Sequence, residues 1–422
     1  MKLTLSNAIL INLNVMLGAG IFINTVELSK RAGPYGGLLY LAIAVCVIPL
    51  MVTLAQLTRI YPSGGFYTYA QQTIGPFAGF ISAWSYFVAK LASGTLMLHV
   101  ALSLLQQIII PLRAINIFAL DIFVLTLFTA LNLLDVRTGS RIQLGFLILK
   151  LVPITFVIVA GLYLFNPALI NASPALTPLL SAIPLVLYAT MGFEAICALT
   201  NQLENPQRDG PRAIIGSFTI VVAIVAIFQT VLYASVGPQL INQASYLGTF
   251  PTLLAYLLSS PVAQGAVIAG LNSALAASAL GGFYGILFSN HWNLFILAQN
   301  HLIPVSGYLQ RLNRHDIPTM TVLVQAVVCA LYLLITGAQQ LWLQQIAAMG
   351  VTIAYGVSIY ALLKTRVPLA IKMICAMGIA TCILIIGTAL SNLIHAGSII
   401  PLAALASLLG IGTVFYLTSR RT

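Results

Sequence analysis

The chain has 422 residues, of which 60% are hydrophobic and only 6% are charged. Ordinary soluble domains are about 45–50% apolar and about 25% charged, so this composition excludes a soluble enzyme, a nucleic-acid-binding protein and a disordered scaffold. The 18 Lys and Arg residues outnumber 7 Asp and Glu residues. These basic residues lie in short loops between apolar runs, as in the cytoplasmic loops of membrane proteins. We therefore expect a membrane protein.

Twelve apolar segments have about the 20 residues that a helix needs to cross a bilayer. No segment alternates apolar and polar residues as a transmembrane strand does, so the sequence predicts an all-α protein. The predicted spans are 6–28, 37–58, 77–108, 115–134, 143–165, 179–201, 213–236, 252–289, 319–337, 341–363, 369–391 and 398–418. Segments 77–108 and 252–289 exceed one bilayer thickness and should tilt or project beyond it.

The basic residues also predict the orientation of the chain. If the N-terminus is cytoplasmic, thirteen Lys and Arg residues fall in cytoplasmic segments, and three fall outside: Lys30, Arg31 and Arg113. By the positive-inside rule, we expect a multi-pass protein of the cytoplasmic (inner) membrane with both termini in the cytoplasm. The first apolar segment has no small-residue cleavage site, so we interpret it as a retained span and not as a signal peptide.

Charged residues inside the predicted spans are candidates for function. Lys90, Lys150 and one acidic residue, Glu194, fall within spans, where a charge costs at least about 2.5–3.5 kcal/mol on insertion scales. Each of them could also snorkel or form a structural ion pair. The five cysteines lie in apolar stretches without metal-ligand spacing, so we expect small buried side chains, no metal and no cofactor.

Two spans contain helix-breaking sequences. Gly18 and Gly20 weaken span 1, and Gly192 precedes the mid-membrane Glu194 in span 6. Interrupted helices in corresponding positions of two five-span halves indicate a transporter binding site. The free N–H groups of such a break suit a carboxylate, and its free carbonyls suit an ammonium. The sequence therefore favours a zwitterionic ligand, although Gly-x-Gly also occurs where membrane helices merely pack closely.

Six motifs are distributed over spans 1 to 7: Gly18-Ala19-Gly20-Ile21-Phe22, Ala32-Gly33-Pro34, Tyr61-Pro62-Ser63-Gly64-Gly65-Phe66-Tyr67-Thr68-Tyr69, Gly79-Phe80 with Trp84 and Tyr86, Lys150-Leu151-Val152-Pro153, and the run from Asn205 to Ile214. In residues and in order they resemble the motifs of the amino acid–polyamine–organocation (APC) superfamily of amino acid permeases. Beyond span 7 the resemblance weakens. Gln299-Asn300-His301 replaces an Arg-Asp-Gly, and Gln56 and Asn201-Gln202 stand where the family has acids, so the family's cytoplasmic gating does not carry over directly.

The resemblance implies a leucine-transporter-type fold with discontinuous helices 1 and 6. Spans 1–5 (residues 1–165) and spans 6–10 (166–366) would form an inverted repeat, and spans 11–12 (367–422) would be peripheral. It also implies a substrate site at the two breaks. The substrate carboxylate would be held by the N–H groups around Gly18, namely those of Ala19, Gly20 and Ile21, and the amine by the carbonyls of Met16, Tyr188 and Met191, beside Gly192. Tyr188 would also be an aromatic gate.

Lys150 is the residue from which we predict what drives transport. In the family that the chain resembles, this lysine reaches the place where sodium-coupled relatives bind their cation. We therefore expect sodium-independent transport, by proton symport or by amino acid exchange. Lys150 and Glu194 are both candidates for carrying a proton, because burial favours the uncharged form of an ionisable group. A sodium-coupled symporter of the same fold and a polyamine or organic amine transporter remain alternatives.

Three further residues of the spans have predicted roles. Lys90 falls about where relatives carry a neutral polar residue near the substrate, and there it should disfavour cationic substrates and could favour acidic or polar ones. Phe283, beside Gly281-Gly282, is a candidate for closing the pocket. His99 is interpreted as a packed or interfacial residue.

Other classes fit the sequence less well. The loop from Arg59 to Gly65 lacks the acid–arginine signature of the major facilitator fold, no segment resembles a channel filter, and neither a HExxH motif nor a Ser–His–Asp set supports a membrane enzyme. No cysteine lies in an outer loop, so no disulfide-linked partner subunit is expected. The predicted partners are a small-molecule amino acid, lipid and, in a symporter, protons; there is no nucleic acid, and the chain would be a monomer or a homodimer.

Overall fold

The computed structural model describes residues 2–18, 20–170, 182–395 and 397–419, and helices make up almost all of this part of the chain. The first half contains α1 (Leu5–Met16), α2 (Gly20–Ile23), α3 (Thr25–Ala32), η1 (Gly33–Tyr35), α4 (Gly36–Ile60), α5 (Gly65–Gln71), α6 (Pro76–Ile108), η2 (Ile110–Ala114), α7 (Ile117–Leu131), α8 (Val136–Tyr163) and η3 (Pro167–Ile170). The second half contains α10 (Ile183–Thr190), η4 (Ala195–Gln202), α11 (Pro206–Ile241), η5 (Tyr246–Gly248), α12 (Thr249–Leu257), α13 (Pro261–Gln299), α14 (Ser306–Leu309), α15 (Thr319–Thr336), α16 (Gln340–Lys364), α17 (Leu369–His395) and α18 (Ile400–Ser419).

Ten helical stretches of the described residues are long and apolar enough to cross a membrane. They correspond to ten of the predicted spans. The other two predicted spans correspond to α7, an apolar helix of 15 residues, and to α10 with η4, of which residues 179–181 lie outside the described part. An all-helical membrane protein is thus confirmed, and the ends of many helices follow the hydropathy pattern closely.

Polar caps and prolines fix the ends that hydropathy does not. Helix α8 begins seven residues before the predicted span, because the Asp135 side chain accepts a hydrogen bond from the Thr138 N–H at 3.0 Å and caps the helix. Helix α11 likewise begins early, with Pro206 at its first turn, a position that suits a residue without an N–H group.

The single long span predicted over 252–289 is wrong. The structure has two helices there, α12 and α13, separated by residues 258–260, and α13 continues to Gln299. Pro261 occupies the first turn of α13, and the Ser260 side chain caps that helix by accepting from the Ala263 N–H at 3.5 Å. A serine followed by proline is a helix-start signal that apolar content alone does not reveal.

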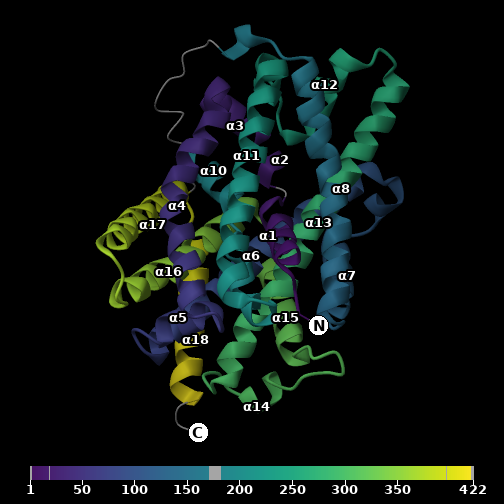
Figure 1. Ribbon diagram of the computed structural model, residues 1–422. Helices are drawn as coiled ribbons and strands as arrows, with labels where there is room; N and C mark the ends of the chain where they lie inside the picture. Colours follow the sequence, from purple (N-terminus) through teal and green to yellow (C-terminus); the bar gives the residue numbers. More distant parts are fainter. Residues whose placement is uncertain (1, 19, 171–181, 396, 420–422) are drawn as a thin grey trace.

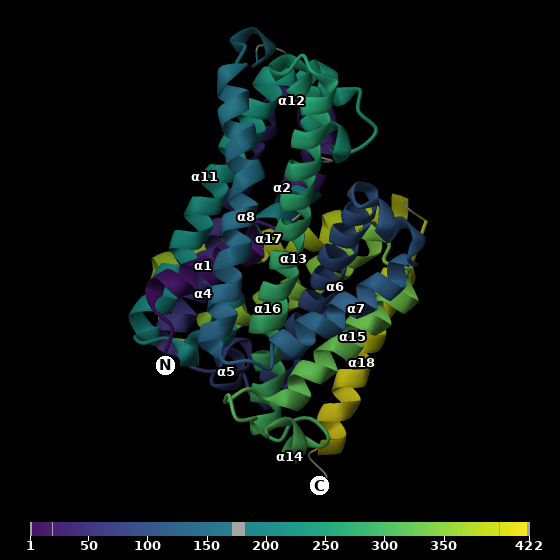
Figure 2. The same cartoon turned by 90° about the vertical axis from the view of Figure 1, so that its right-hand side faces the viewer.

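The predicted interruptions of spans 1 and 6 are confirmed. Helix α1 ends at Met16 and α2 begins at Gly20, while α10 ends at Thr190 and η4 begins at Ala195. Figure 1 shows α1 and α2 in the middle of the view, with α8, α11 and α13 running beside them, whereas in Figure 2 α1 lies toward the left-hand side. Most of the Leu5–Ile23 stretch is buried inside the protein. The broken helices are therefore enclosed by protein, as non-helical backbone at membrane depth requires.

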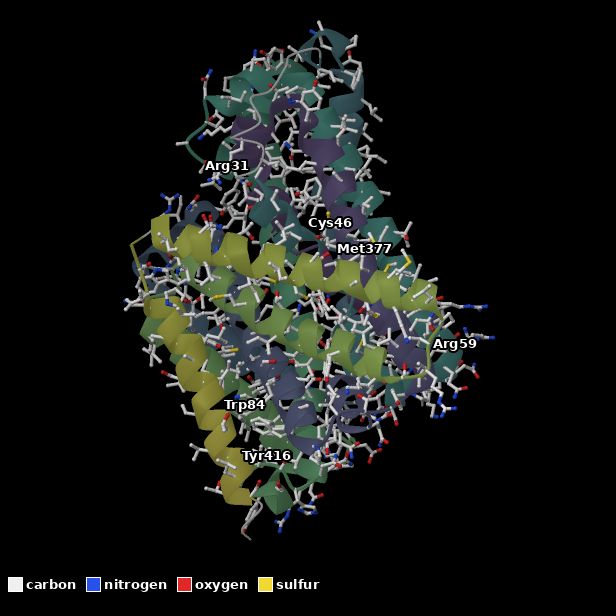
Figure 3. The ribbon with its side chains drawn as sticks, turned by 90° about the vertical axis from the view of Figure 1, so that its left-hand side faces the viewer. Arg31, Cys46, Arg59, Trp84, Met377 and Tyr416 are labelled. Carbon is white, nitrogen blue, oxygen red and sulfur yellow. The ribbon has the colours of Figure 1, made fainter. Side chains whose placement is uncertain are left out.

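The last two long helices lie against the outside of this bundle (Figure 3). Helix α17 crosses α4, where the Thr381 hydroxyl donates to the Cys46 carbonyl at 2.6 Å. Helix α18 runs along α6, where the Trp84 indole donates to the Leu408 carbonyl at 2.8 Å. Both helices expose large apolar side chains on their other faces, among them Met373, Ile383, Val414 and Leu417, which suits contact with lipid.

The segment before α1 pairs with the segment after η4. Leu3 donates its N–H to the Gln202 carbonyl at 2.6 Å, and the Glu204 N–H donates to the Leu3 carbonyl at 3.0 Å. Leu3 and Leu203 thereby form an isolated parallel β-bridge. This bridge connects the start of one broken helix to the end of the other.

Candidate functional site

The two helix breaks face each other. A Cβ atom added to Gly20 would lie 3.4 Å from the Tyr188 ring and 3.6 Å from the Ala189 Cα. A Cβ atom added to Gly192 would lie 3.0 Å from the Met16 Cγ. Gly192 also has a φ of +120°, which L side chains rarely adopt. The glycines thus allow the backbone of α1–α2 to approach that of α10–η4 closely.

Each break leaves backbone groups without helical partners. The last carbonyls of α1 and α10 and the first N–H groups of α2 have no partner within their own helix. Met16 ends α1, and Met191 is extended (φ −81°, ψ 155°) just after α10. The region therefore offers both hydrogen-bond acceptors and donors from the main chain to a small polar ligand.

Lys150 extends from α8 to the first break. Its side chain is fully buried, and its ammonium donates to the Asn14 carbonyl in the last turn of α1 at 2.6 Å. On the neighbouring helix α13, the Ser278 hydroxyl donates to the Leu17 carbonyl at 3.3 Å. The Lys150 side-chain nitrogen thus lies beside the carbonyls at the end of α1.

Lys90 and Glu194 form an ion pair at the second break. The Lys90 ammonium lies 3.1 Å from Glu194 Oε1, and the side chains are 7% and 0% exposed. The Tyr86 hydroxyl donates to the same oxygen at 3.3 Å, and the Gly192 N–H donates to Oε2 at 2.9 Å. Glu194 therefore accepts hydrogen bonds from three donors, and it connects α6 to the irregular segment between α10 and η4.

A small cavity of about 30 Å³ lies between the two breaks and α6. Its walls come from α1, α2, α6, α10 and α16: Val15, Met16, Gly18, Gly20, Lys90, Ser93, Met97, Tyr188, Ala189, Met191, Ala347, Ala348 and Val351. A space of this size has room for water but not for an amino acid. A ligand as large as an amino acid therefore requires the walls to move.

A second, larger pocket of about 320 Å³ lies next to the cavity and reaches the surface beside Arg31. Tyr188, Met191 and Ala348 line both spaces. The Tyr188 hydroxyl lies 3.3 Å from the Ser93 hydroxyl on α6. The Tyr188 side chain thus lies between this pocket, hereafter the vestibule, and the cavity.

Most of the predicted site residues meet at this cavity, but not all. Met16, Gly18, Gly20, Lys90, Tyr188 and Met191 line it, and Gly192 lies against Met16. Ile21 is buried without lining it, and Ala19 lies outside the described residues. Phe283 is also absent from the lining. Its ring stacks on Phe128 of α7, with centroids 5.8 Å apart.

Several polar residues of this region were not singled out from the sequence. On α1, Asn14 donates to the Gln143 side chain at 2.7 Å and to the Gly281 carbonyl at 2.8 Å. Asn12 donates to the Phe193 carbonyl at 2.7 Å and accepts from the Ile196 N–H at 3.0 Å. Asparagines within an apolar span could have predicted these contacts, because such side chains form hydrogen bonds with neighbouring membrane helices.

Two more acidic residues fall within the predicted spans, Glu27 in 6–28 and Asp121 in 115–134, so the interpretation of Glu194 as the one acidic residue there is wrong. The Asp121 Oδ2 lies 2.7 Å from His99 Nδ1, and the Asp121 side chain is fully buried. His99 is therefore not only packed, as its ring also interacts with a carboxylate. Neither residue lines the cavity.

Comparison with known proteins places the chain among transporters. A family model described as amino acid permease matches residues 3–414. The chain is 32% identical over 283 residues to an uncharacterized transporter of Mycobacterium tuberculosis, an alignment that covers 65% of this chain and 62% of that protein. It is 24% identical over 386 residues to an uncharacterized amino acid permease of Bacillus subtilis, with 85% and 79% covered.

A cystine/glutamate transporter of Homo sapiens is 29% identical over 237 residues, which are 52% of this chain and 47% of that protein. The alignment with the mycobacterial transporter covers 62% of that protein, so the chain spans less than two thirds of its length. These relatives are membrane transporters and not enzymes, in agreement with the many apolar helices. Because the family model matches nearly the whole chain, this multi-pass membrane protein belongs to the amino acid permease family.

Proposed function

We propose that this protein transports amino acids across the cytoplasmic membrane by alternating access, without sodium. The observation that carries the proposal is the meeting of two helix breaks at one enclosed cavity. Binding at the midplane between discontinuous helices is a recurrent arrangement in secondary transporters. The family model adds the ligand class, because the matched family is one of amino acid permeases.

The main chain at the breaks binds the common part of an amino acid. The N–H groups of Gly20 and Ile21, together with Ala19 from outside the described residues, hold the carboxylate at the positive end of a helix. The carbonyls of Met16, Tyr188 and Met191 hold the amine. Because all of these are backbone groups, this half of the site accepts any α-amino acid.

Lys150 replaces a metal cation. Its ammonium donates to the Asn14 carbonyl at 2.6 Å, so the positive charge that a sodium ion would supply to the end of α1 comes from the protein. Two couplings are compatible with this arrangement. In an exchanger Lys150 remains a fixed charge, and in a proton symporter Lys150 or Glu194 carries the proton.

The same proposal includes the architecture. Ten long apolar helices, α7 and the α10–η4 pair make twelve spans in a leucine-transporter-type fold. Residues 1–165 and 166–366 form its inverted repeats, and α17 and α18 are peripheral. Both termini lie in the cytoplasm. Exposed apolar faces on α17 and α18 are compatible with a monomer or with a homodimer.

Uptake of radiolabelled amino acids into proteoliposomes tests the function. Purified protein is assayed with and without sodium, an inward proton gradient and internal amino acid, and a polyamine is included among the cold competitors. Sodium-independent uptake that needs internal amino acid identifies an exchanger. Uptake driven by the proton gradient into empty vesicles identifies a symporter. Strict sodium dependence, or competition by the polyamine alone, would contradict the proposal.

A further inference from the structure

Among the described residues that line the cavity, Lys90 is the one side chain of formal charge. Its ammonium is already paired with Glu194, which lies behind it and is itself absent from the lining. A cation facing a binding site would ordinarily attract acidic ligands. Here the positive charge of Lys90 is neutralised within the protein, because Glu194 Oε1 is 3.1 Å from the ammonium.

We propose that the Lys90–Glu194 pair makes the side-chain half of the site electrically neutral, so that the transporter selects amino acids with small, uncharged side chains. This inference rests on the proposed function and adds the substrate class to it. It also differs from what Lys90 alone would suggest, because an isolated lysine would favour acidic substrates.

Both kinds of charged substrate are disfavoured by this arrangement. An acidic side chain would have to displace Glu194, which also accepts hydrogen bonds from Tyr86 and from the Gly192 N–H. A basic side chain would place its charge against the Lys90 ammonium. Like charges brought together in a poorly solvated site are costly. Only an uncharged side chain leaves the pair intact.

The other residues that line the cavity limit the size of the substrate side chain. Ala189, Ala347, Ala348 and Val351 present small apolar surfaces, and the enclosed space is about 30 Å³. Met97 also lines the cavity, and a Cβ atom added to Gly18 would lie 2.6 Å from its Cε. Methionine is flexible and can move aside, but a methyl or hydroxymethyl side chain requires the least displacement.

Competition assays with charge-matched variants test the proposal. Uptake of radiolabelled alanine is measured against unlabelled serine, leucine, aspartate and lysine. In the wild type, serine should compete at least tenfold better than aspartate or lysine. Glu194→Gln leaves Lys90 without a counter-charge, so aspartate should gain at least tenfold relative to serine. The double variant Lys90→Met with Glu194→Gln removes both charges and should lose that gain.

Two controls separate the possible outcomes. Lys372→Met removes a charge from an exposed position on α17 and should leave the ranking unchanged. Met97→Ala should improve competition by leucine, since it widens the cavity without altering charge. Each variant is first checked for a monodisperse, cooperatively melting protein. If Glu194→Gln does not fold, Lys90→Met takes its place: it leaves Glu194 without its counter-charge, so lysine should gain at least tenfold relative to serine, and an unchanged ranking would contradict the proposal.

Failure of the proposed function and failure of the neutral selectivity would give different results. Wild-type protein that takes up no amino acid contradicts the proposed function. Wild-type protein that takes up amino acids but is inhibited equally by aspartate, lysine and serine contradicts the neutral selectivity alone. A folded Glu194→Gln variant with the wild-type ranking would show that the ion pair only holds α6 against the second break.

Discussion

The buried Lys150 side chain forms a hydrogen bond with a backbone carbonyl in the last turn of α1. Its ammonium donates to the Asn14 carbonyl at 2.6 Å and is fully shielded from solvent. A hydrogen bond to a charged group contributes about 1.5–3 kcal/mol, which corresponds to roughly a tenfold to hundredfold change in an equilibrium constant. The donor of this hydrogen bond lies 136 residues away from its acceptor in the sequence.

Lys150→Met should reduce sodium-independent uptake by about tenfold or more, because the freed carbonyls of α1 then lose their cation. Initial uptake rates in sodium-free proteoliposomes measure the effect. Lys372→Met, at an exposed position, is the matched control and should transport at the wild-type rate. A Lys150→Met protein that is folded and equally active would show that the ammonium has only a packing role.

Gly192→Ala should destabilise the fold. The residue has a φ of +120°, and an added Cβ would lie 3.0 Å from the Met16 Cγ. Such strain costs about 1–3 kcal/mol. A thermal melt in detergent should show a lower midpoint than the wild type. Gly145→Ala is the control: nothing lies within 4 Å of its added Cβ, and its midpoint should stay or rise because alanine favours helices.

The sequence predicted these site residues one at a time and could not pair them. Gly192 was identifiable, since glycine within an apolar span signals a break. That Lys90 meets Glu194 depends on two side chains 104 positions apart. No local pattern specifies this contact, because it arises only when α6 packs against the irregular segment after α10.

At the scale of elements, apolar length predicted most helices, and local polar groups determined their ends. Hydropathy cannot distinguish one long helix from two apolar helices in series, so residues 252–289 were interpreted as one span. Pro261 and the Ser260 cap divide them into α12 and α13. The short η4 helix similarly escaped prediction as a separate element, since its residues are as apolar as those of α10.

Asn14 fastens α1 to two neighbouring helices, by bonds to Gln143 of α8 and to the Gly281 carbonyl of α13. A double-mutant cycle of Asn14→Ala and Gln143→Ala isolates the bond between the side chains. Hydrogen bonds between membrane helices average about 0.6 kcal/mol and reach about 1.7 kcal/mol. We expect a coupling energy in this range from reversible unfolding in detergent. Additive effects of the two changes would mean that the pair does not contribute to α1 docking.

On the scale of the whole molecule, the cavity and the vestibule are separate compartments with shared walls. Tyr188, Met191 and Ala348 belong to both, and the Tyr188 hydroxyl lies 3.3 Å from that of Ser93. Alternating access requires that such a barrier opens on one side at a time. The barrier on the vestibule side therefore includes the Tyr188 side chain, together with Met191 and Ala348.

Tyr188→Ala should join the two compartments and expose Ser93. In a background without the five native cysteines, Ser93→Cys should react at least tenfold faster with a membrane-impermeant thiol reagent when Tyr188→Ala is present. The labelling rate is followed by mass spectrometry, and Ser93→Cys with Tyr188 intact is the reference. Equal rates in both proteins would show that other side chains keep the cavity closed.

The bridge between Leu3 and the chain after η4 makes relative motion of the two broken helices measurable. The amide hydrogens of Leu3 and Glu204 are bonded across the two broken helices, so they exchange with solvent only when these segments separate. Hydrogen–deuterium exchange at both amides should therefore change together when substrate is added. The chain thus contains its own reporter of motion at that end, one that needs neither a label nor a mutation.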